Sequence, residues 1–318
     1  MQVGFIGLGM MGASMASNLQ AAGYKLIIHD VNRSAATNHI KAGATWADTP
    51  KALAAASDVV FTSLPGPPEM ESVTLDANGL IEGMKPGAAY FDLSTNSPKL
   101  VRRVHAAFAE KGFHMLDAPV SGGPTGAKSR KLAIWVGGDE AIFNKHKKEL
   151  DAIGDAARYI GAIGAGSVAK LVHNCAGYAV QTALAEVFTM GVKAGVEPLS
   201  LWEAVRSGAG GRRRTFDGLV DQFLINKYEP PAFALKLAHK DMFLATELGR
   251  EVGVPMRLAN AALADMTEAL NKGWDKRDSR SPMSLQVDRA GVKIEVDPQR
   301  IAEVFDRDPP FKGDPKRS

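Results

Sequence analysis

Short apolar runs and stretches of helical spacing alternate along the first half of the chain. Strands alternating with helices are typical of βαβ units in a parallel sheet. The pattern therefore predicts an α/β fold whose first, doubly wound domain spans residues 1–162. Strands are expected at 3–6, 26–29, 59–63, 89–92, 115–117, 133–137 and 159–160, and helices at 10–22, 32–42, 49–55, 98–111 and 140–153.

The second half of the chain has a different pattern. From residue 164 onward the strand signals fade, and apolar residues recur at spacings of three and four over 165–194, 199–207, 235–252 and 256–270. A mostly helical domain is predicted for residues 163–278. After residue 279, prolines such as Pro282 and Pro298 are mixed with charges, which predicts an extended tail over 279–318.

Composition narrows the class of protein. The 38 Lys and Arg residues nearly balance the 35 Asp and Glu residues, which argues against a nucleic-acid-binding surface and leaves small anions as partners. A single cysteine, Cys175, forms no internal disulfide, which fits a reducing cytoplasm. Lys170, Glu186 and Lys193 interrupt the longest helical stretch, so no membrane span is expected. No cluster of metal ligands is apparent.

A glycine-rich turn follows the first predicted strand. Gly7-Leu-Gly9-Met-Met-Gly12 leads directly into a predicted helix. Glycines at this spacing allow a tight turn, admit a pyrophosphate close to the backbone and bring the helix against the sheet. The helix N-terminus then favours the phosphate charge. The segment predicts a Rossmann-type dinucleotide site formed by Gly7, Leu8, Gly9, Met10, Met11 and Gly12.

Two residues after the second strand bear on the choice of cofactor. Asp30 lies 18 residues after Gly12, where a carboxylate accepts hydrogen bonds from the adenosine ribose and repels a 2′-phosphate. NAD is therefore expected. Arg33 could instead pair with that phosphate, so NADP stays open, and Asp30 has the alternative role of a turn residue or helix cap.

Four motifs in this order resemble the β-hydroxyacid dehydrogenases, the family of 3-hydroxyisobutyrate dehydrogenase and tartronate semialdehyde reductase. The glycine-rich turn comes first, and the resemblance extends from about residue 3 to 279. The other three are Asp117-Ala-Pro-Val-Ser121-Gly122-Gly123, then Gly161-Ala-Ile-Gly164-Ala-Gly166-Ser-Val-Ala-Lys170-Leu-Val-His173-Asn174, then Lys236-Leu-Ala-His-Lys240-Asp241.

The resemblance implies roles for individual residues. The substrate carboxylate would lie in a small anion nest formed by Ser121, Gly122 and Gly123, a combination of a hydroxyl and exposed backbone donors. Lys240 would lie near the nicotinamide and the substrate. Further cofactor contacts are implied for Leu64, Pro65 and Thr95. A homodimer or homotetramer is also expected from the resemblance.

Lys170 and Asn174 share one face of a predicted helix, since they are four residues apart. A lysine beside a nicotinamide and a carbonyl is able to donate a proton to the developing alkoxide, or to accept one during oxidation. By resemblance Lys170 is the catalytic lysine and Asn174 the amide that orients the substrate. His173 either orients the substrate or is structural. The motifs imply hydride transfer between NAD(P) and a small 3-hydroxy acid or semialdehyde.

Several alternatives stay open at this stage. Lys170-Leu-Val-His173-Asn174 also resembles a segment of 6-phosphogluconate dehydrogenase, although its long helical extension is absent. Imine reductases share the architecture but replace the lysine. A nucleotide-binding protein without turnover would keep the same fold. Arg212-Arg213-Arg214 either binds a second anionic group of the substrate or forms a solvated turn or a subunit contact.

Overall fold

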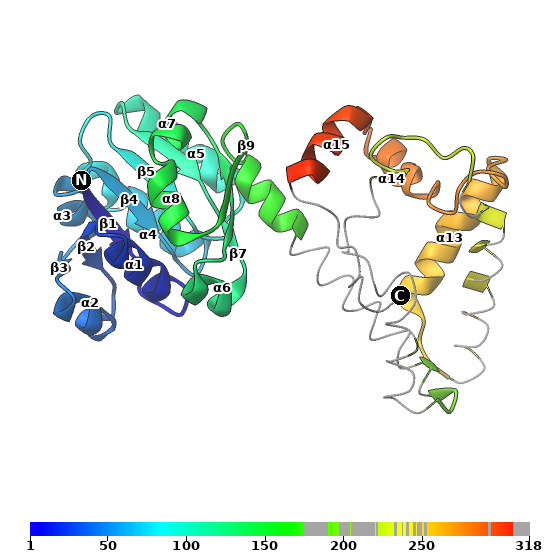
Figure 1. Ribbon diagram of the computed structural model, residues 1–318, viewed down its shortest axis with the longest axis horizontal. Helices are drawn as coiled ribbons and strands as arrows, with labels where there is room; N and C mark the ends of the chain where they lie inside the picture. Colours follow the sequence, from blue (N-terminus) through cyan, green and yellow to red (C-terminus); the bar gives the residue numbers. More distant parts are fainter. Residues whose placement is uncertain are drawn as a thin grey trace. The chain divides into compact units, whose positions relative to one another are not determined.

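The protein folds into two compact units, Met1–Ala176 and Gly177–Ser318 (Figure 1). The first unit extends past residue 162 because the helix over residues 165–173 begins on its sheet, where the N–H groups of Gly164 and Ser167 donate to Asp117. The computed structural model describes residues 1–173, 190–191, 193–196, 204, 220, 222–231, 234–236, 238–239, 242–243, 246, 250, 253–291 and 294–307.

A largely parallel sheet forms the centre of the first unit and confirms the predicted α/β class. Its strand order is β3-β2-β1-β4-β5-β6-β8-β7, with β9 beside β8. Strand β8 is antiparallel to β6 and β7 and parallel to β9. The strands are β1 (Gln2–Ile6), β2 (Lys25–His29), β3 (Thr45–Trp46), β4 (Val59–Thr62), β5 (Ala89–Asp92), β6 (His114–Asp117), β7 (Val120–Ser121), β8 (Ala133–Gly137) and β9 (Ala156–Gly161).

Local capping explains where the helices begin. The Thr49 hydroxyl accepts the N–H of Ala52 at 3.1 Å and starts α3 (Pro50–Ala55). The Ser97 hydroxyl accepts the N–H of Leu100 at 3.2 Å and starts α5 (Pro98–Glu110) in the same way. In both, a polar cap is followed by proline at the first helical position, where its missing N–H costs nothing.

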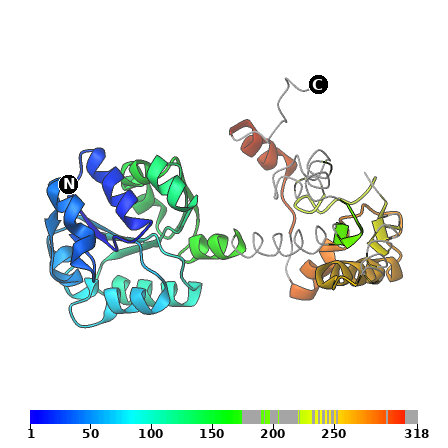
Figure 2. The same cartoon turned by 90° about the horizontal axis from the view of Figure 1, so that it is seen from below.

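Helices cover both faces of the sheet, because the inner strands are apolar on both sides (Figure 2). Phe5, Phe61 and Phe91 point to one face and pack against α1 (Gly12–Ala21) and α8 (Lys147–Ile153). On the opposite face, Val60, Tyr90 and Met115 pack against α3, α4 (Pro67–Leu75) and α5. The remaining helices of this unit are α2 (Thr37–Lys41), α6 (Gly123–Ser129) and α7 (Glu140–Lys145).

In the first unit, two predicted helices are subdivided, and the α-helices α4 and α6 were not predicted. The stretch 140–153 divides at His146 into α7 and α8, and the stretch 32–42 starts as a 3-10 turn (Arg33–Ala36) before α2. Helices α4 and α6 begin at glycine and proline, Gly66-Pro67-Pro68 and Gly122-Gly123-Pro124, a composition that predicts a loop. Strands β3 and β7, of two residues each, are too short to show a period.

Two helices lie in the described part of the tail after residue 279, which contradicts the prediction of an extended arm there. Helix α13 (Arg257–Asn271) is followed by α14 (Met283–Ala290) and α15 (Pro298–Arg307). Pro282 and Pro298 sit at the start of these helices, where proline is tolerated, rather than inside them. In the part of the chain that the structure describes, no helix combines the length and apolar character needed to cross a bilayer.

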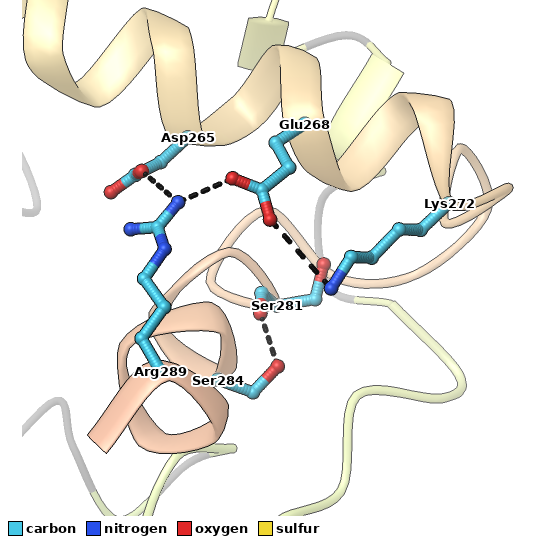
Figure 3. Close-up of polar contacts among 6 residues, drawn as sticks. All are labelled: Asp265, Glu268, Lys272, Ser281, Ser284 and Arg289. Atoms are coloured by element: carbon cyan, nitrogen blue, oxygen red, sulfur yellow. Dashed lines mark hydrogen bonds and ion pairs between the residues drawn. The ribbon is translucent and has the colours of Figure 1, made fainter. Parts of the chain in front are cut away.

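An ion-pair network joins α14 to α13 in the second unit (Figure 3). The Arg289 guanidinium of α14 reaches Asp265 at 2.9 Å and also contacts Glu268, and Glu268 lies 3.6 Å from Lys272. These side chains are more than 40% exposed, so each pair contributes little by itself. The network shows that the beginning of the tail packs against the helical unit.

The glycine-rich turn provides a stability test. A Cβ on Gly12, the first residue of α1, would lie 1.9 Å from the Gly7 carbonyl oxygen. Because neither backbone segment moves freely, Gly12→Ala should lower the free energy of unfolding by about 1–3 kcal/mol. Thermal denaturation measures it, with Gly9→Ala as the matched control because a Cβ there meets nothing within 4 Å. Equal melting temperatures for the two variants would contradict the observed packing.

Candidate active site

A cavity of about 480 Å³ opens at the carboxyl ends of β1, β2 and β4. A Cβ on Gly7 would lie 2.2 Å from the Ser63 carbonyl oxygen, so only glycine fits there. No side chain caps α1 and its first turn holds no acidic residue, which leaves that helix end suited to an anion. The lining residues are Ile6, Gly7, Gly9, Met10, Met11, Gly12, His29, Asp30, Val31, Ser63, Leu64, Pro65, Glu69, Ser72 and Val73.

Asp30 joins the glycine-rich turn to the end of β2. One carboxylate oxygen accepts the N–H of Leu8 at 2.6 Å, and the other accepts the N–H of Asn32 at 2.7 Å. Asp30 therefore does act as a turn residue, and it also lines the cavity. The carboxylate is held where an adenosine ribose would approach the turn, which fits a dinucleotide.

Arg33, which follows the same turn, contacts Trp46 and Asp48. Its guanidinium lies 5.2 Å from the centre of the Trp46 ring and 3.7 Å from Asp48. The Trp46 indole N–H donates to Asp48 at 2.8 Å. These contacts partly balance the charge of Arg33, although it is 71% exposed and the ion pair is weak.

A buried polar network holds the loops after β4 and β5. The Asp92 carboxylate accepts hydrogen bonds from Thr62 at 2.8 Å and Asn96 at 2.6 Å, and burial raises the pKa of Asp92. The Leu64 N–H donates to the Ser94 hydroxyl at 2.9 Å, which links the two loops. Of the cofactor contacts implied here, Leu64 and Pro65 line the cavity, whereas Thr95 is half-buried outside its lining.

The proposed carboxylate nest lies in an exposed, glycine-dependent turn after β7. Gly122 and Gly123 have φ values of 139° and 62°, which L side chains rarely adopt, and both are exposed. The Ser121 hydroxyl oxygen lies 3.1 Å from Nε2 of His173. The centre of the His173 ring lies 5.3 Å from that of the Trp135 ring. His173 thus contacts the nest directly, which favours the role of orienting its hydroxyl.

Lys170 lies on the helix over residues 165–173, one turn before His173. The side chain is half-buried, and burial lowers the pKa of Lys170. This shift brings a proton donor and acceptor closer to neutral pH. The predicted residues Asn174 and Lys240, together with Arg212, Arg213 and Arg214, lie outside the described residues.

Sequence reasoning did not identify the contribution of α4 to the cavity. Glu69, Ser72 and Val73 line it from this helix, whose proline-rich start predicted a loop. Apolar Met70 and polar Thr74, both buried and four residues apart, are the available signal of a helix there. Asp117 appeared in a motif without a role, yet both of its carboxylate oxygens bond to the start of the helix that carries Lys170.

Two family models together match most of the chain. One, described as the NAD binding domain of 6-phosphogluconate dehydrogenase, matches residues 2–164. The other, described as NAD-binding of NADP-dependent 3-hydroxyisobutyrate dehydrogenase, matches residues 164–285. The two models meet where the helix with Lys170 begins.

Individual relatives agree along nearly their whole length. The 2-(hydroxymethyl)glutarate dehydrogenase of Eubacterium barkeri is 33% identical over 92% of this chain and 97% of its own. The NAD-dependent L-serine dehydrogenase of Pseudomonas aeruginosa is 34% identical over 87% and 95%. The solved 3-hydroxyisobutyrate dehydrogenase of Mycobacterium tuberculosis with L-serine is 28% identical over 90% and 98%, with a TM-score of 0.63.

These matches separate the enzyme families left open by the sequence. The domain described for 6-phosphogluconate dehydrogenase accounts for the first unit alone, whereas the 3-hydroxyisobutyrate dehydrogenase type continues through the helix with Lys170. Relatives matched over nearly their full length, and the cavity beside the glycine-rich turn, agree with that assignment. The chain belongs to the β-hydroxyacid dehydrogenase family, NAD(P)-dependent oxidoreductases that act on small hydroxy acids.

Proposed function

We propose that this protein interconverts a small 3-hydroxy acid and its semialdehyde, with Lys170 as the proton donor and acceptor. The observation that carries the proposal is the position of Lys170, half-buried with a lowered pKa on a helix that contacts the carboxylate nest through His173 and Ser121. The cytoplasmic location and a homodimer or homotetramer belong to the same proposal, supported by the single cysteine and by the family resemblance.

The residues divide the work of binding and proton transfer. Backbone and hydroxyl donors of Ser121, Gly122 and Gly123 would bind the carboxylate and fix one end of the substrate. Neutral Nζ of Lys170 would accept the hydroxyl proton during oxidation, and the ammonium form would return it during reduction. Asn174 and Lys240 would orient the substrate. A dinucleotide bound at the glycine-rich turn would supply the hydride acceptor or donor.

A spectrophotometric screen tests the reaction itself. The absorbance of the reduced nicotinamide would be followed with NAD and with NADP across 3-hydroxyisobutyrate, L-serine and 2-(hydroxymethyl)glutarate, the compounds that the relatives' names suggest. Turnover of at least one supports the proposal. Tight cofactor binding without any turnover would instead favour a nucleotide-binding protein that lacks catalysis.

Lys170→Ala should abolish most turnover and leave cofactor affinity unchanged. Loss of a positioned general acid and base lowers kcat by about 10²–10⁴-fold. Steady-state kinetics and cofactor fluorescence titration measure the two effects separately. In the wild-type protein, oxidation should accelerate as pH rises through the pKa of Lys170, which burial places below that of a free lysine, because the neutral amine is the base. A variant with wild-type kcat would remove Lys170 from the mechanism.

We also propose that NAD is the preferred cofactor. Asp30 places a fixed carboxylate at the ribose end of the cavity, and Arg33 is partly neutralised by Asp48. The L-serine dehydrogenase relative is NAD-dependent by name, whereas the second family model is described for an NADP-dependent enzyme.

Asp30→Ala should shift the NAD-to-NADP ratio of kcat/KM toward NADP by about tenfold or more, because one hydrogen bond to a carboxylate contributes about 1.5–3 kcal/mol. Kinetics with both cofactors measure the ratio. Asp48→Ala, which removes the ion-pair partner of Arg33 without touching Asp30, should produce a smaller shift in the same direction. A wild-type preference for NADP would refute the assignment.

The substrate class has a finer candidate, a dicarboxylic 3-hydroxy acid. Arg212, Arg213 and Arg214 suit a second carboxylate because a guanidinium pairs with both oxygens, and 2-(hydroxymethyl)glutarate, named for one relative, carries two carboxylates. One of the three single Arg→Met variants should lower kcat/KM about tenfold to a hundredfold for the dicarboxylate. Comparison with 3-hydroxyisobutyrate provides the control. Equal losses on both substrates would exclude a dedicated contact.

A further inference from the structure

One buried carboxylate joins the end of β6 to the helix over residues 165–173. Asp117 is 1% exposed, and its Oδ1 accepts the N–H of Gly164 at 2.7 Å. Its Oδ2 accepts the N–H of Ser167 at 2.6 Å. N–H groups in the first turn of a helix have no acceptor within the helix. A single side chain, distant in sequence, satisfies two of them.

Two glycines lie directly against this carboxylate. A Cβ on Gly137 would lie 2.6 Å from Asp117 Oδ1, and a Cβ on Gly166 would lie 3.0 Å from Oδ2 and 2.3 Å from the Trp135 carbonyl oxygen. The two glycines therefore make room for the carboxylate between β8 and the helix. A carboxylate at a helix N-terminus is also favoured by the helix dipole, which offsets part of its burial.

The same strand-to-helix connection governs Lys170. Lys170 follows Ser167 by three residues, so one helical turn separates the Asp117 anchor from the lysine. A second contact, between Ser121 and His173, ties the next turn to the nest. Both ties come from the segment over residues 117–123 that leads from β6 to the nest. The helix and the nest are thereby fixed to each other on both sides of Lys170.

We propose that Asp117 is a positioning residue for proton transfer: by holding the first turn of this helix, it fixes Lys170 relative to the carboxylate nest. The inference rests on the proposed role of Lys170. Displacement of a reacting group by about 1 Å costs about a hundredfold in rate, so a loosened anchor should slow the chemical step.

The test uses the full-length protein in single-turnover experiments at saturating NAD, with the most active of the three hydroxy acids in the screen. Asp117→Asn turns an amide group toward an N–H donor and loses one of the two bonds. The rate constant for NADH formation should fall by about tenfold to a hundredfold. The amplitude, which reports the active fraction, should change much less. Hydrogen exchange of the amides in residues 164–168 should also accelerate, a readout that needs no turnover.

Glu149→Gln is the matched control. Glu149 is also a buried carboxylate, 4% exposed, but it lies on α8 and pairs with His146 at 3.4 Å instead of holding the helix with Lys170. This variant should lose stability. Its rate constant at saturating NAD should stay within about threefold of wild type, far less than the loss expected from misplacing Lys170, and exchange at residues 164–168 should stay unchanged.

A second variant covers failure of Asp117→Asn to fold. Asp117→Glu keeps the buried carboxylate but lengthens the side chain by one methylene, so the two oxygens no longer match the N–H groups of Gly164 and Ser167 in the observed geometry. It should slow the single-turnover rate constant by about tenfold. The inference is overturned if the folded variant keeps the wild-type rate constant or loses only amplitude. It is also overturned if Glu149→Gln causes the same loss of rate. Lys170→Ala in the same assay distinguishes failure of this inference from failure of the proposed function. A wild-type rate constant for Lys170→Ala would refute the proposed function itself.

Discussion

The candidate site depends on how backbone amides are satisfied at the carboxyl edge of the parallel sheet. Loops that leave this edge carry N–H groups without a ladder partner, and a buried one without an acceptor is costly. Three aspartates supply acceptors there. Asp30 bonds to Leu8 and Asn32, Asp92 bonds to Ser94, and Asp117 bonds to Gly164 and Ser167. Each carboxylate fixes a different part of the site.

The chemistry of these carboxylates follows from their surroundings. Burial raises the pKa of Asp92 and Asp117, while the hydrogen bonds that they accept oppose that shift. The observed hydrogen bonds hold these side chains in place as acceptors of backbone N–H groups. Burial disfavours the charged form of an amine as well, and it therefore lowers the pKa of Lys170. The site combines a frame of hydrogen-bonded acidic side chains with one amine whose proton is easier to remove.

Much of the first unit follows from the sequence because its order is encoded locally. Buried strands such as β4 and β5 are continuous apolar runs, and caps such as Thr49 and Ser97 mark helix starts. The prediction of helices failed where the local composition is typical of a loop but the folded chain is helical. Helix α4 begins with two prolines and α14 follows another, which local propensity assigns to loops, but tertiary contacts make them helical starts.

The candidate site was predictable from the sequence only where its residues belong to one short motif. Asp30, Leu64, Pro65 and the residues of the glycine-rich turn other than the buried Leu8 line one cavity, and their contact with a cofactor stays a prediction. The bonds of Asp117 to Gly164 and Ser167 join residues about fifty positions apart, and no local pattern encodes them. The contact of His173 with Ser121 is equally remote in sequence. Motifs therefore predicted candidate residues, whereas the fold was needed to show which of them hold the others.

The division between holding and reacting residues also explains why the helix with Lys170 is attached so firmly to the sheet. A lysine side chain has several rotatable bonds, so its amine is placed no better than the backbone that carries it. The Asp117 anchor removes motion at the start of the helix, and partial burial of the stem restricts the side chain itself. Since the proposed nest is tied to the same helix through Ser121 and His173, the nest and Lys170 share one structural support. Shared support of this kind keeps Lys170 at a constant position relative to the nest even if other parts of the molecule move.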